Sequence, residues 1–160
     1  NSTALLAKGQ LGAGVVDVEL DRRDIEKATR IEANHDSYAR AYGFIHNRVL
    51  ILRSDGLELR GEDTLLPHAK YKGREEVPAH LRFHLGPDIE LLLADDKRSV
   101  VMRLEDGSSW TFMTALGTVE VDDSIWVDEN GRPNPTRQLV IGVSAPRGGM
   151  TIGWVLKFLG

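Results

Sequence analysis

Apolar and polar residues alternate along much of the chain, and this period of two predicts β-strands. The alternating stretches, bounded by their apolar positions, are Val16 to Leu20, Leu57 to Leu59, Leu81 to Leu85, Val100 to Leu104, Trp110 to Phe112, Val119 to Val121 and Ile152 to Phe158. Asp-Gly or Asn-Gly pairs at 55–56, 106–107 and 130–131 supply the positive φ that tight hairpins require. The spacing predicts about ten strands, few longer than nine residues, as in a sandwich or a barrel.

Three segments depart from this alternation. Residues 44–53 are apolar on both faces, which predicts a central strand that is covered on both sides. Residues 22–31 carry charges at helical spacing, but their neighbours favour a strand. The short stretch Leu5 to Leu11 is the remaining candidate for a helix. Because no repeat or linker divides the chain, we expect residues 1–160 to form a single all-β domain.

Composition excludes several classes of function. With 160 residues, 41% apolar and 28% charged, the chain is long enough for one buried core and is not a disordered tail. A net charge of −4 gives no reason to expect a nucleic-acid partner. The lack of cysteine excludes disulfides, thiolate catalysis and Cys-ligated metal, and no cofactor or metal motif is present. No apolar run approaches the roughly 18–20 residues of a membrane span, so no membrane partner is expected.

The first cluster of candidate functional residues contains His35, Tyr38, Tyr42 and His46. His and Tyr can together serve as general base and general acid, or bind a sugar by stacking and hydrogen bonding. The alternative is a polar hairpin between two strands, in which the tyrosine rings only pack.

The second candidate is the stripe His80, Arg82 and His84, which period two places on one face of a strand, about 7 Å apart in succession. Such a stripe could hold a carboxylate or a sulfate. It could equally be the solvated face of a strand, and two histidines four residues apart along a strand are too distant to share a zinc ion. We expect the acidic run Glu58 to Asp63 to be a solvated strand end.

Four motifs occur in the order expected of one family. They are Glu32-Ala33-Asn34-His35-Asp36-Ser37-Tyr38, Tyr42-Gly43-Phe44-Ile45-His46-Asn47-Arg48, Leu59-Arg60-Gly61-Glu62-Asp63 and His80-Leu81-Arg82-Phe83-His84-Leu85-Gly86-Pro87-Asp88. Together they resemble the C-terminal β-domain of bacterial heparinase II/III-like proteins, from about residue 30 to the end. The resemblance implies an antiparallel β-sandwich that is joined, in the longer protein, to an N-terminal α/α toroid.

The resemblance also implies chemistry for the parent protein. Such proteins are polysaccharide lyases, which cleave uronic-acid glycans by β-elimination: a base removes the C5 proton, and an acid assists the departing C4 oxygen. Their catalytic Tyr and carboxylate-neutralising residues belong to the toroid, so no catalytic residue is carried over to this chain. His35, Tyr38, His46, Arg82 and His84 remain candidates for substrate binding.

Three hypotheses follow. In the first, the chain is an excised or processed β-sandwich of a lyase, inactive in isolation, that forms a wall of the glycan cleft or packs on the toroid; the start at Asn1 rather than Met agrees with this expectation. In the second, it is a carbohydrate-binding module for acidic polysaccharides. In the third, it is a purely structural or assembly domain. The resemblance suggests the bacterial periplasm or cell envelope as its location.

Overall fold

Strands make up most of the chain in the computed structural model, which describes residues 3–5, 11–14, 18–69, 73 and 75–160. In chain order the elements are β1 (Thr3–Leu5), β2 (Leu11–Gly14), β3 (Val18–Ile25), β4 (Ala28–His35), α1 (Ala39–Tyr42), β5 (Phe44–Arg53), β6 (Glu58–Pro67), β7 (Glu76–His84), β8 (Glu90–Leu93), β9 (Ser99–Arg103), β10 (Ser109–Thr114), β11 (Thr118–Val127), β12 (Pro133–Pro146) and β13 (Met150–Phe158). The all-β prediction is confirmed.

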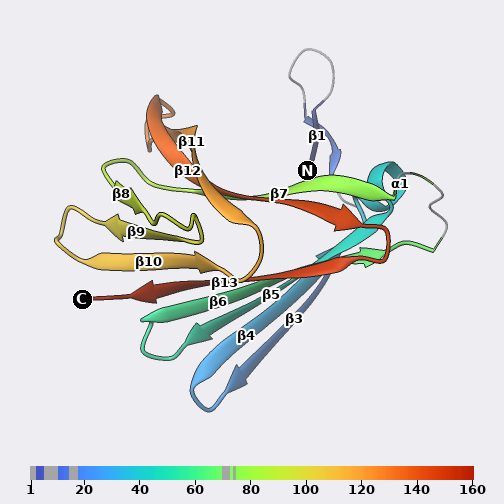
Figure 1. Cartoon of the computed structure of the whole chain (residues 1–160), viewed down its shortest axis with the longest axis horizontal. Coiled ribbons are helices and arrows are strands. Elements are labelled where there is room, and N and C mark those ends of the chain that lie inside the picture. Colours follow the sequence, from blue (N-terminus) through green and yellow to red (C-terminus); the bar gives the residue numbers. More distant parts are fainter. Residues whose placement is uncertain (1–2, 6–10, 15–17, 70–72, 74) are drawn as a thin grey trace.

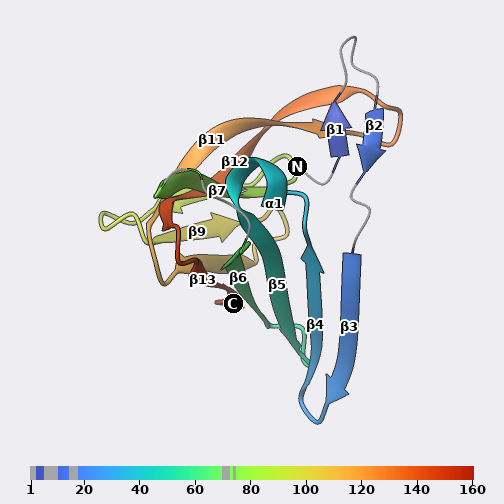
Figure 2. The same ribbon diagram turned by 90° about the vertical axis from the view of Figure 1, so that its right-hand side faces the viewer.

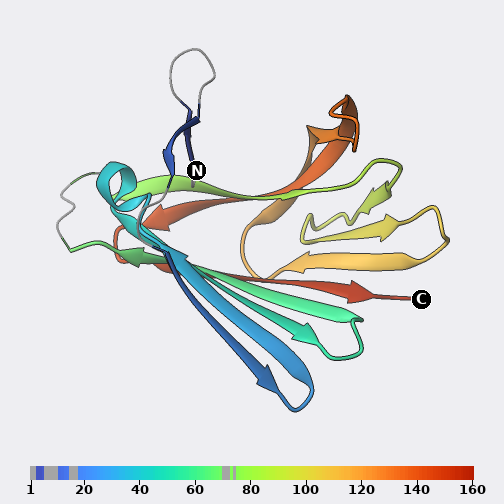
Figure 3. The same ribbon diagram turned by 180° about the vertical axis from the view of Figure 1, so that it is seen from behind.

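The strands form two facing antiparallel sheets and a separate hairpin (Figure 1). The large sheet has eight strands in the order β3-β4-β5-β6-β13-β10-β9-β8, and the small sheet has three in the order β11-β12-β7. Strands β1 and β2 pair only with each other among the described residues. Seen from behind, β13 runs between β6 and β10 and joins the two halves of the large sheet (Figure 3).

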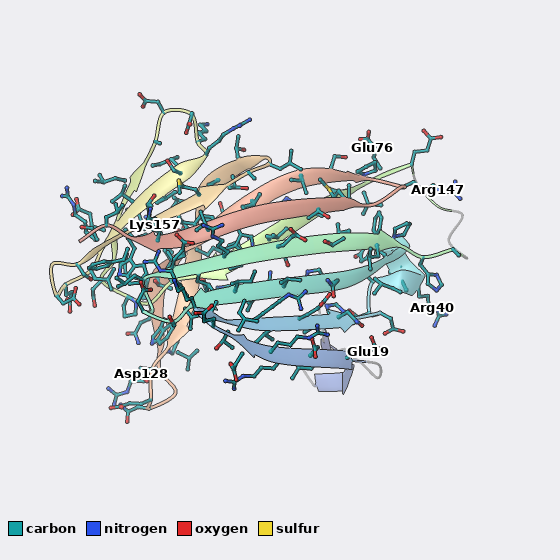
Figure 4. The ribbon with its side chains drawn as sticks, turned by 90° about the horizontal axis from the view of Figure 1, so that it is seen from below. Glu19, Arg40, Glu76, Asp128, Arg147 and Lys157 are labelled. Carbon is teal, nitrogen blue, oxygen red and sulfur yellow. The ribbon has the colours of Figure 1, made fainter. Side chains whose placement is uncertain are left out.

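The core lies between the inner faces of the two sheets. The buried members of its larger cluster are Leu81, Val100, Met102, Phe112, Val119, Leu139, Ile141, Ile152 and Trp154. Every one of them lies on a strand of one sheet or the other, as a sandwich requires. The opposite, outer face of the large sheet carries charged side chains, from Glu19 on β3 to Lys157 on β13 (Figure 4).

The small sheet is narrower than the large one, so within the described part of the chain no strand covers one part of the large sheet's inner face. Strand β3 forms the edge of the large sheet, away from β7 and β12 (Figure 2). Its inward-facing Val18 and Leu20 are 60% and 70% exposed, although both are apolar. Two apolar side chains on the inner face of β3, Val18 and Leu20, are therefore open to solvent, and the charged Arg22 and Asp24 continue the same face.

Two expectations about single segments need correction. Residues 44–53 do form a strand with neighbours on both edges, β4 and β6, but its faces are not both covered: only Phe44 is fully buried. Within the Leu5 to Leu11 stretch, Leu5 and Leu11 belong to strands β1 and β2, and residues 6–10 lie outside the described part. The one helix among the described residues is α1, four residues long, and no described helix is long or apolar enough to cross a membrane.

The structure has more and longer strands than predicted: thirteen are described, and β12 alone has 14 residues. Strand β12 escaped prediction because Pro133 and Pro135 interrupt its pattern. These prolines are tolerated because β7 pairs with β12 only from Gln138 onward, so β12 has a free edge where they lie. Residues 22–25 belong to β3 and residues 28–31 to β4, with a turn at 26–27, so this segment is strand rather than helix, as predicted.

Candidate functional site

A cleft of about 510 Å³ lies between the inner face of β4, β5 and β6 and the free edge of β7. We call it the β7 cleft. All five predicted site residues line it: His35, Tyr38, His46, Arg82 and His84. These residues come from the two sequence clusters, which are more than thirty positions apart, and the sandwich brings both clusters to one place.

His35 and His46 form the centre of the cluster on the large sheet. They are directly opposite each other on β4 and β5, because the two strands pair in that register. His35 Nε2 is 3.2 Å from His46 Nδ1, and Ser37 Oγ is 2.6 Å from the other nitrogen of His35, Nδ1. The two imidazoles are therefore joined directly by a hydrogen bond.

Asp63 anchors this pair from β6. Its Oδ1 lies 2.7 Å from His46 Nε2 and accepts a hydrogen bond from Arg48 Nε, also at 2.7 Å. Its Oδ2 accepts a hydrogen bond from Trp154 Nε1 at 2.8 Å, and the side chain is 1% exposed. The expectation of a solvated strand end is wrong for Asp63, which lies on the inner face of β6 together with Leu59, Gly61 and Leu65.

The buried carboxyl of Asp63 is ionised. Burial by itself would raise its pKa, but hydrogen bonds from His46 and Arg48, the Arg48 charge and the hydrogen bond from Trp154 outweigh burial and hold the pKa below its usual value. An ionised carboxylate only accepts hydrogen bonds, so His46 Nε2 must carry a hydrogen. The pKa of His35 is lowered, first by burial and then by repulsion from His46.

Tyr38 completes the cluster through ring contacts. Its ring meets that of His35 edge-on, with centroids 5.1 Å apart, and meets that of Tyr42 at 6.1 Å. The tight turn at α1 orients it: the Tyr38 carbonyl accepts hydrogen bonds from the backbone N–H of Tyr42 and Gly43, and Gly43 adopts a φ of 82°. Burial raises the pKa of the Tyr38 hydroxyl, so the phenol stays protonated.

Arg82 and His84 reach the cleft from the edge of β7 but turn their side chains to the outer face of the small sheet. There Arg82 pairs with Asp122 at 3.4 Å, and His84 Nδ1 is 2.7 Å from Ser124 Oγ. The structure thus brings the five predicted residues to one cleft but joins only His35, Tyr38 and His46 by direct contact.

Sequence reasoning missed Asp63, Trp154 and the role of Arg48. The sequence does contain an indication that Asp63 faces the core. It is separated from the apolar Leu59 and Leu65 by even numbers of positions, so the alternation of a strand places all three side chains on the same face. In the described residues no group of three or more His, Asp or Glu has the arrangement of a metal site. The cluster is suited to hold and exchange protons and to bind hydrogen-bonding ligands.

Comparison with known families gives a match over nearly the whole chain. The family model described as "Heparinase II/III-like, C-terminal" matches residues 1–155. Among curated proteins, FtsZ-localized protein C of Caulobacter vibrioides is 32% identical over 149 residues. That alignment covers 89% of this chain and 26% of the relative, so the chain spans about a quarter of the relative's length.

Solved structures agree on the fold. The heparan sulfate lyase HepC of Pedobacter heparinus superimposes with a TM-score of 0.75 at 10% identity, over 91% of this chain and 22% of the lyase. A heparinase III superimposes with a TM-score of 0.70 at 14% identity, over 99% of this chain and 23% of the enzyme. At such identities the likeness shows a shared fold, with this chain equivalent to less than a quarter of each lyase.

Proposed function

Because the chain belongs to the heparinase II/III-like C-terminal family, we propose that it is the β-sandwich part of a longer protein and that its β7 cleft forms one wall of a binding site for an acidic glycan. On this proposal the sandwich binds and positions the glycan and carries out no elimination by itself. The acid, the base and the carboxylate-neutralising groups belong to an N-terminal α/α toroid outside this chain.

The composition of the β7 cleft is the observation that carries the proposal. Four histidines and two arginines line it: His35, His46, His80, His84, Arg48 and Arg82. Among the described lining residues the one acid, Asp63, is buried and paired with Arg48. A uronate carboxylate entering the cleft would therefore meet imidazole rings and no unpaired acidic side chain.

The test is binding of a heparosan hexasaccharide, an alternating polymer of glucuronate and N-acetylglucosamine, measured by isothermal titration calorimetry. We expect binding to the wild-type chain, no binding of neutral chitohexaose, and no ultraviolet absorbance from an unsaturated uronate product. Arg82 lies at the rim of the cleft, where the glycan would take it over from Asp122. Arg82→Ala should therefore weaken binding up to about tenfold, as loss of one charge-assisted contact does.

Arg137→Ala is the matched control for Arg82→Ala. Arg137 also lies in the small sheet and pairs with an exposed acid, Asp123, but it does not line the β7 cleft. Its removal should leave affinity unchanged. Equal effects of the two substitutions, failure of the hexasaccharide to bind, or formation of unsaturated product by the chain alone would each contradict the proposal.

A second candidate function rests on the similarity to FtsZ-localized protein C, which at 32% identity is nearer in sequence than the lyases. Here the sandwich is an assembly module of an FtsZ-localized protein. The open apolar strip of Val18 and Leu20 would be its contact surface.

Co-sedimentation with FtsZ filaments assembled in GTP tests this second candidate function. The wild-type chain should pellet with filaments, and Leu20→Glu should remain in the supernatant. A chain that does not pellet, or a Leu20→Glu variant that still pellets, removes this candidate.

A further inference from the structure

The hydrogen bonds of the His35–His46 pair fix where every hydrogen lies when both rings are neutral. Asp63 accepts from His46 Nε2, so His46 Nδ1 is bare and must accept. The group facing it at 3.2 Å, His35 Nε2, therefore carries a hydrogen. His35 Nδ1 is then bare and accepts from the Ser37 hydroxyl at 2.6 Å. Both rings are Nε2–H tautomers, and all donors point toward Asp63.

One added proton fits this arrangement. If it enters at His35 Nδ1, that nitrogen donates to Ser37 Oγ and no other bond changes. If the charge resides on His46 instead, the hydrogen between the rings moves to His46 Nδ1 and His35 becomes the Nδ1–H tautomer. In both forms a single hydrogen lies between the rings, and His35 Nδ1 is protonated.

A second added proton does not fit. It would place N–H groups on both facing nitrogens, which are only 3.2 Å apart, and would put two positive charges on adjoining rings. The hydrogen bond between the rings would have to break. The pair is therefore a unit with one available positive charge, and both rings that can carry the charge line the β7 cleft.

Burial and the neighbouring His46 lower the pKa of His35, which favours the neutral form of this ring in the free protein. From β5, Arg48 adds a positive charge, and from β6, Asp63 adds a negative one that Arg48 already offsets. Asp36 lies in the turn after β4 and favours the charged form of His35. Tyr38, whose hydroxyl pKa is raised by burial, precedes α1, and Tyr42 ends α1. From β7, His80, Arg82 and His84 line the same cleft. From β3, the residue opposite His35 is the uncharged Val18.

We propose that the His35–His46 pair is the anion-recognition element of the β7 cleft, and that it takes up one proton, and only one, when a carboxylate binds. This inference rests on the proposed glycan site and names the group that recognises the uronate. The proton comes from solvent, and no covalent bond to the ligand forms. A carboxylate favours the charged form of the pair, because an opposite charge at short range stabilises it. Binding should consequently strengthen as pH falls.

The first test uses the free protein. Nitrogen-15 spectra of the histidine side chains should show His35 and His46 as Nε2–H tautomers at neutral pH. Acidification should add one proton to the pair while the protein stays folded. Two imidazolium rings in the folded protein, or a different tautomer of His46, would overturn the inference whatever the ligand does.

The second test measures proton uptake. Heparosan hexasaccharide is titrated into the chain in two buffers of different ionisation enthalpy, so that the difference in heat counts the protons taken up. Wild type should take up a measurable part of one proton per molecule bound and never more than one, and His35→Gln, which removes one of the two rings, should take up less. Gln at position 35 can still donate an amide hydrogen to His46 Nδ1, so the fold and the neutral hydrogen bond are kept.

We expect His35→Gln to lower affinity about tenfold at low pH and to reduce the pH dependence of binding. The control is His68→Gln, since His68 does not line the β7 cleft and should leave uptake unchanged. Binding without uptake, or with the same uptake in His35→Gln, overturns the inference while the glycan site stands. Absence of binding overturns both, so the two failures are distinguishable.

Discussion

Trp154 of β13 lies directly opposite Gly61 of β6, and its indole fills the space that a β-carbon on Gly61 would occupy. The close approach brings the indole N–H within 2.8 Å of Asp63 Oδ2. The absence of a side chain at position 61 thus supports both the core and the buried network that fixes His46.

We expect Gly61→Ala to destabilise the protein by about 1–3 kcal/mol, because the new methyl group displaces a packed indole. Urea denaturation followed by tryptophan fluorescence measures the effect. Gly153→Ala is the matched control, since it lies on the neighbouring strand and its β-carbon would meet Ala115 at an ordinary 3.7 Å. The control should leave stability unchanged or raise it by up to about 1 kcal/mol. A Gly61→Ala variant as stable as its control would refute this account of the packing.

Asp63→Asn should cost about 3–5 kcal/mol, because it leaves Arg48 without its counter-charge and presents an N–H group to donors that need an acceptor. The free energy of unfolding in urea is the measurement. Asp122→Asn removes the same charge from an exposed pair with Arg82 and should cost less than about 1 kcal/mol. Equal losses in the two variants would mean that burial of the network is not what makes Asp63 important.

Stability should fall on acidification in two separate ranges of pH. The pKa of His35 in the folded protein is lowered from 6.5, so as pH falls below 6.5 the unfolded chain binds a proton before the folded protein does. The free energy of unfolding therefore decreases as pH falls below 6.5. The pKa of Asp63 is lowered from 3.8, so its contribution is lost as pH falls below 3.8. Exposed carboxyls with lowered pKa, such as Asp55, add to the second range.

Unfolding free energies measured across both ranges check this prediction. His35→Gln should flatten the decline below pH 6.5 and leave the acid range below 3.8 as in wild type. A decline below pH 6.5 that persists unchanged in His35→Gln would assign it to another group.

Substitution by alanine should lower stability strongly at Leu139 and hardly at all at Leu20, although both are leucines on strands. Leu139 is 1% exposed in the core, so Leu139→Ala should cost about 2–5 kcal/mol. Leu20 is 70% exposed on β3, so Leu20→Ala should change stability by less than about 0.5 kcal/mol. Thermal and urea denaturation of the two variants measure this. A large loss from Leu20→Ala would show that the strip is covered, for example in a dimer.

The strands could be predicted wherever one face is buried, because burial imposes period two on the sequence. Leu81 and Phe83 therefore marked β7, while the prolines of β12 obscured a strand whose other residues pair normally. The position of His35 and His46 on paired strands could not be predicted, since no local pattern specifies the register of β4 against β5. Asp63 was misjudged because a charged residue is by default exposed, and only the fold supplies Arg48, His46 and Trp154 around it.

The position of β13 between β6 and β10 has a consequence for the order of events in folding. During synthesis β3 to β6 and β8 to β10 emerge early, but nothing joins them into one sheet until residues 150–158 have left the ribosome. The same residues bring Trp154 to Asp63, so the carboxylate stays without its third hydrogen bond until then. We therefore expect a slow, late step that is set by loop closure, because the paired residues run from Leu65 with Met150 to Glu58 with Lys157, about 85 to 99 positions apart. Until that step is complete, the nascent chain exposes strand edges to chaperones.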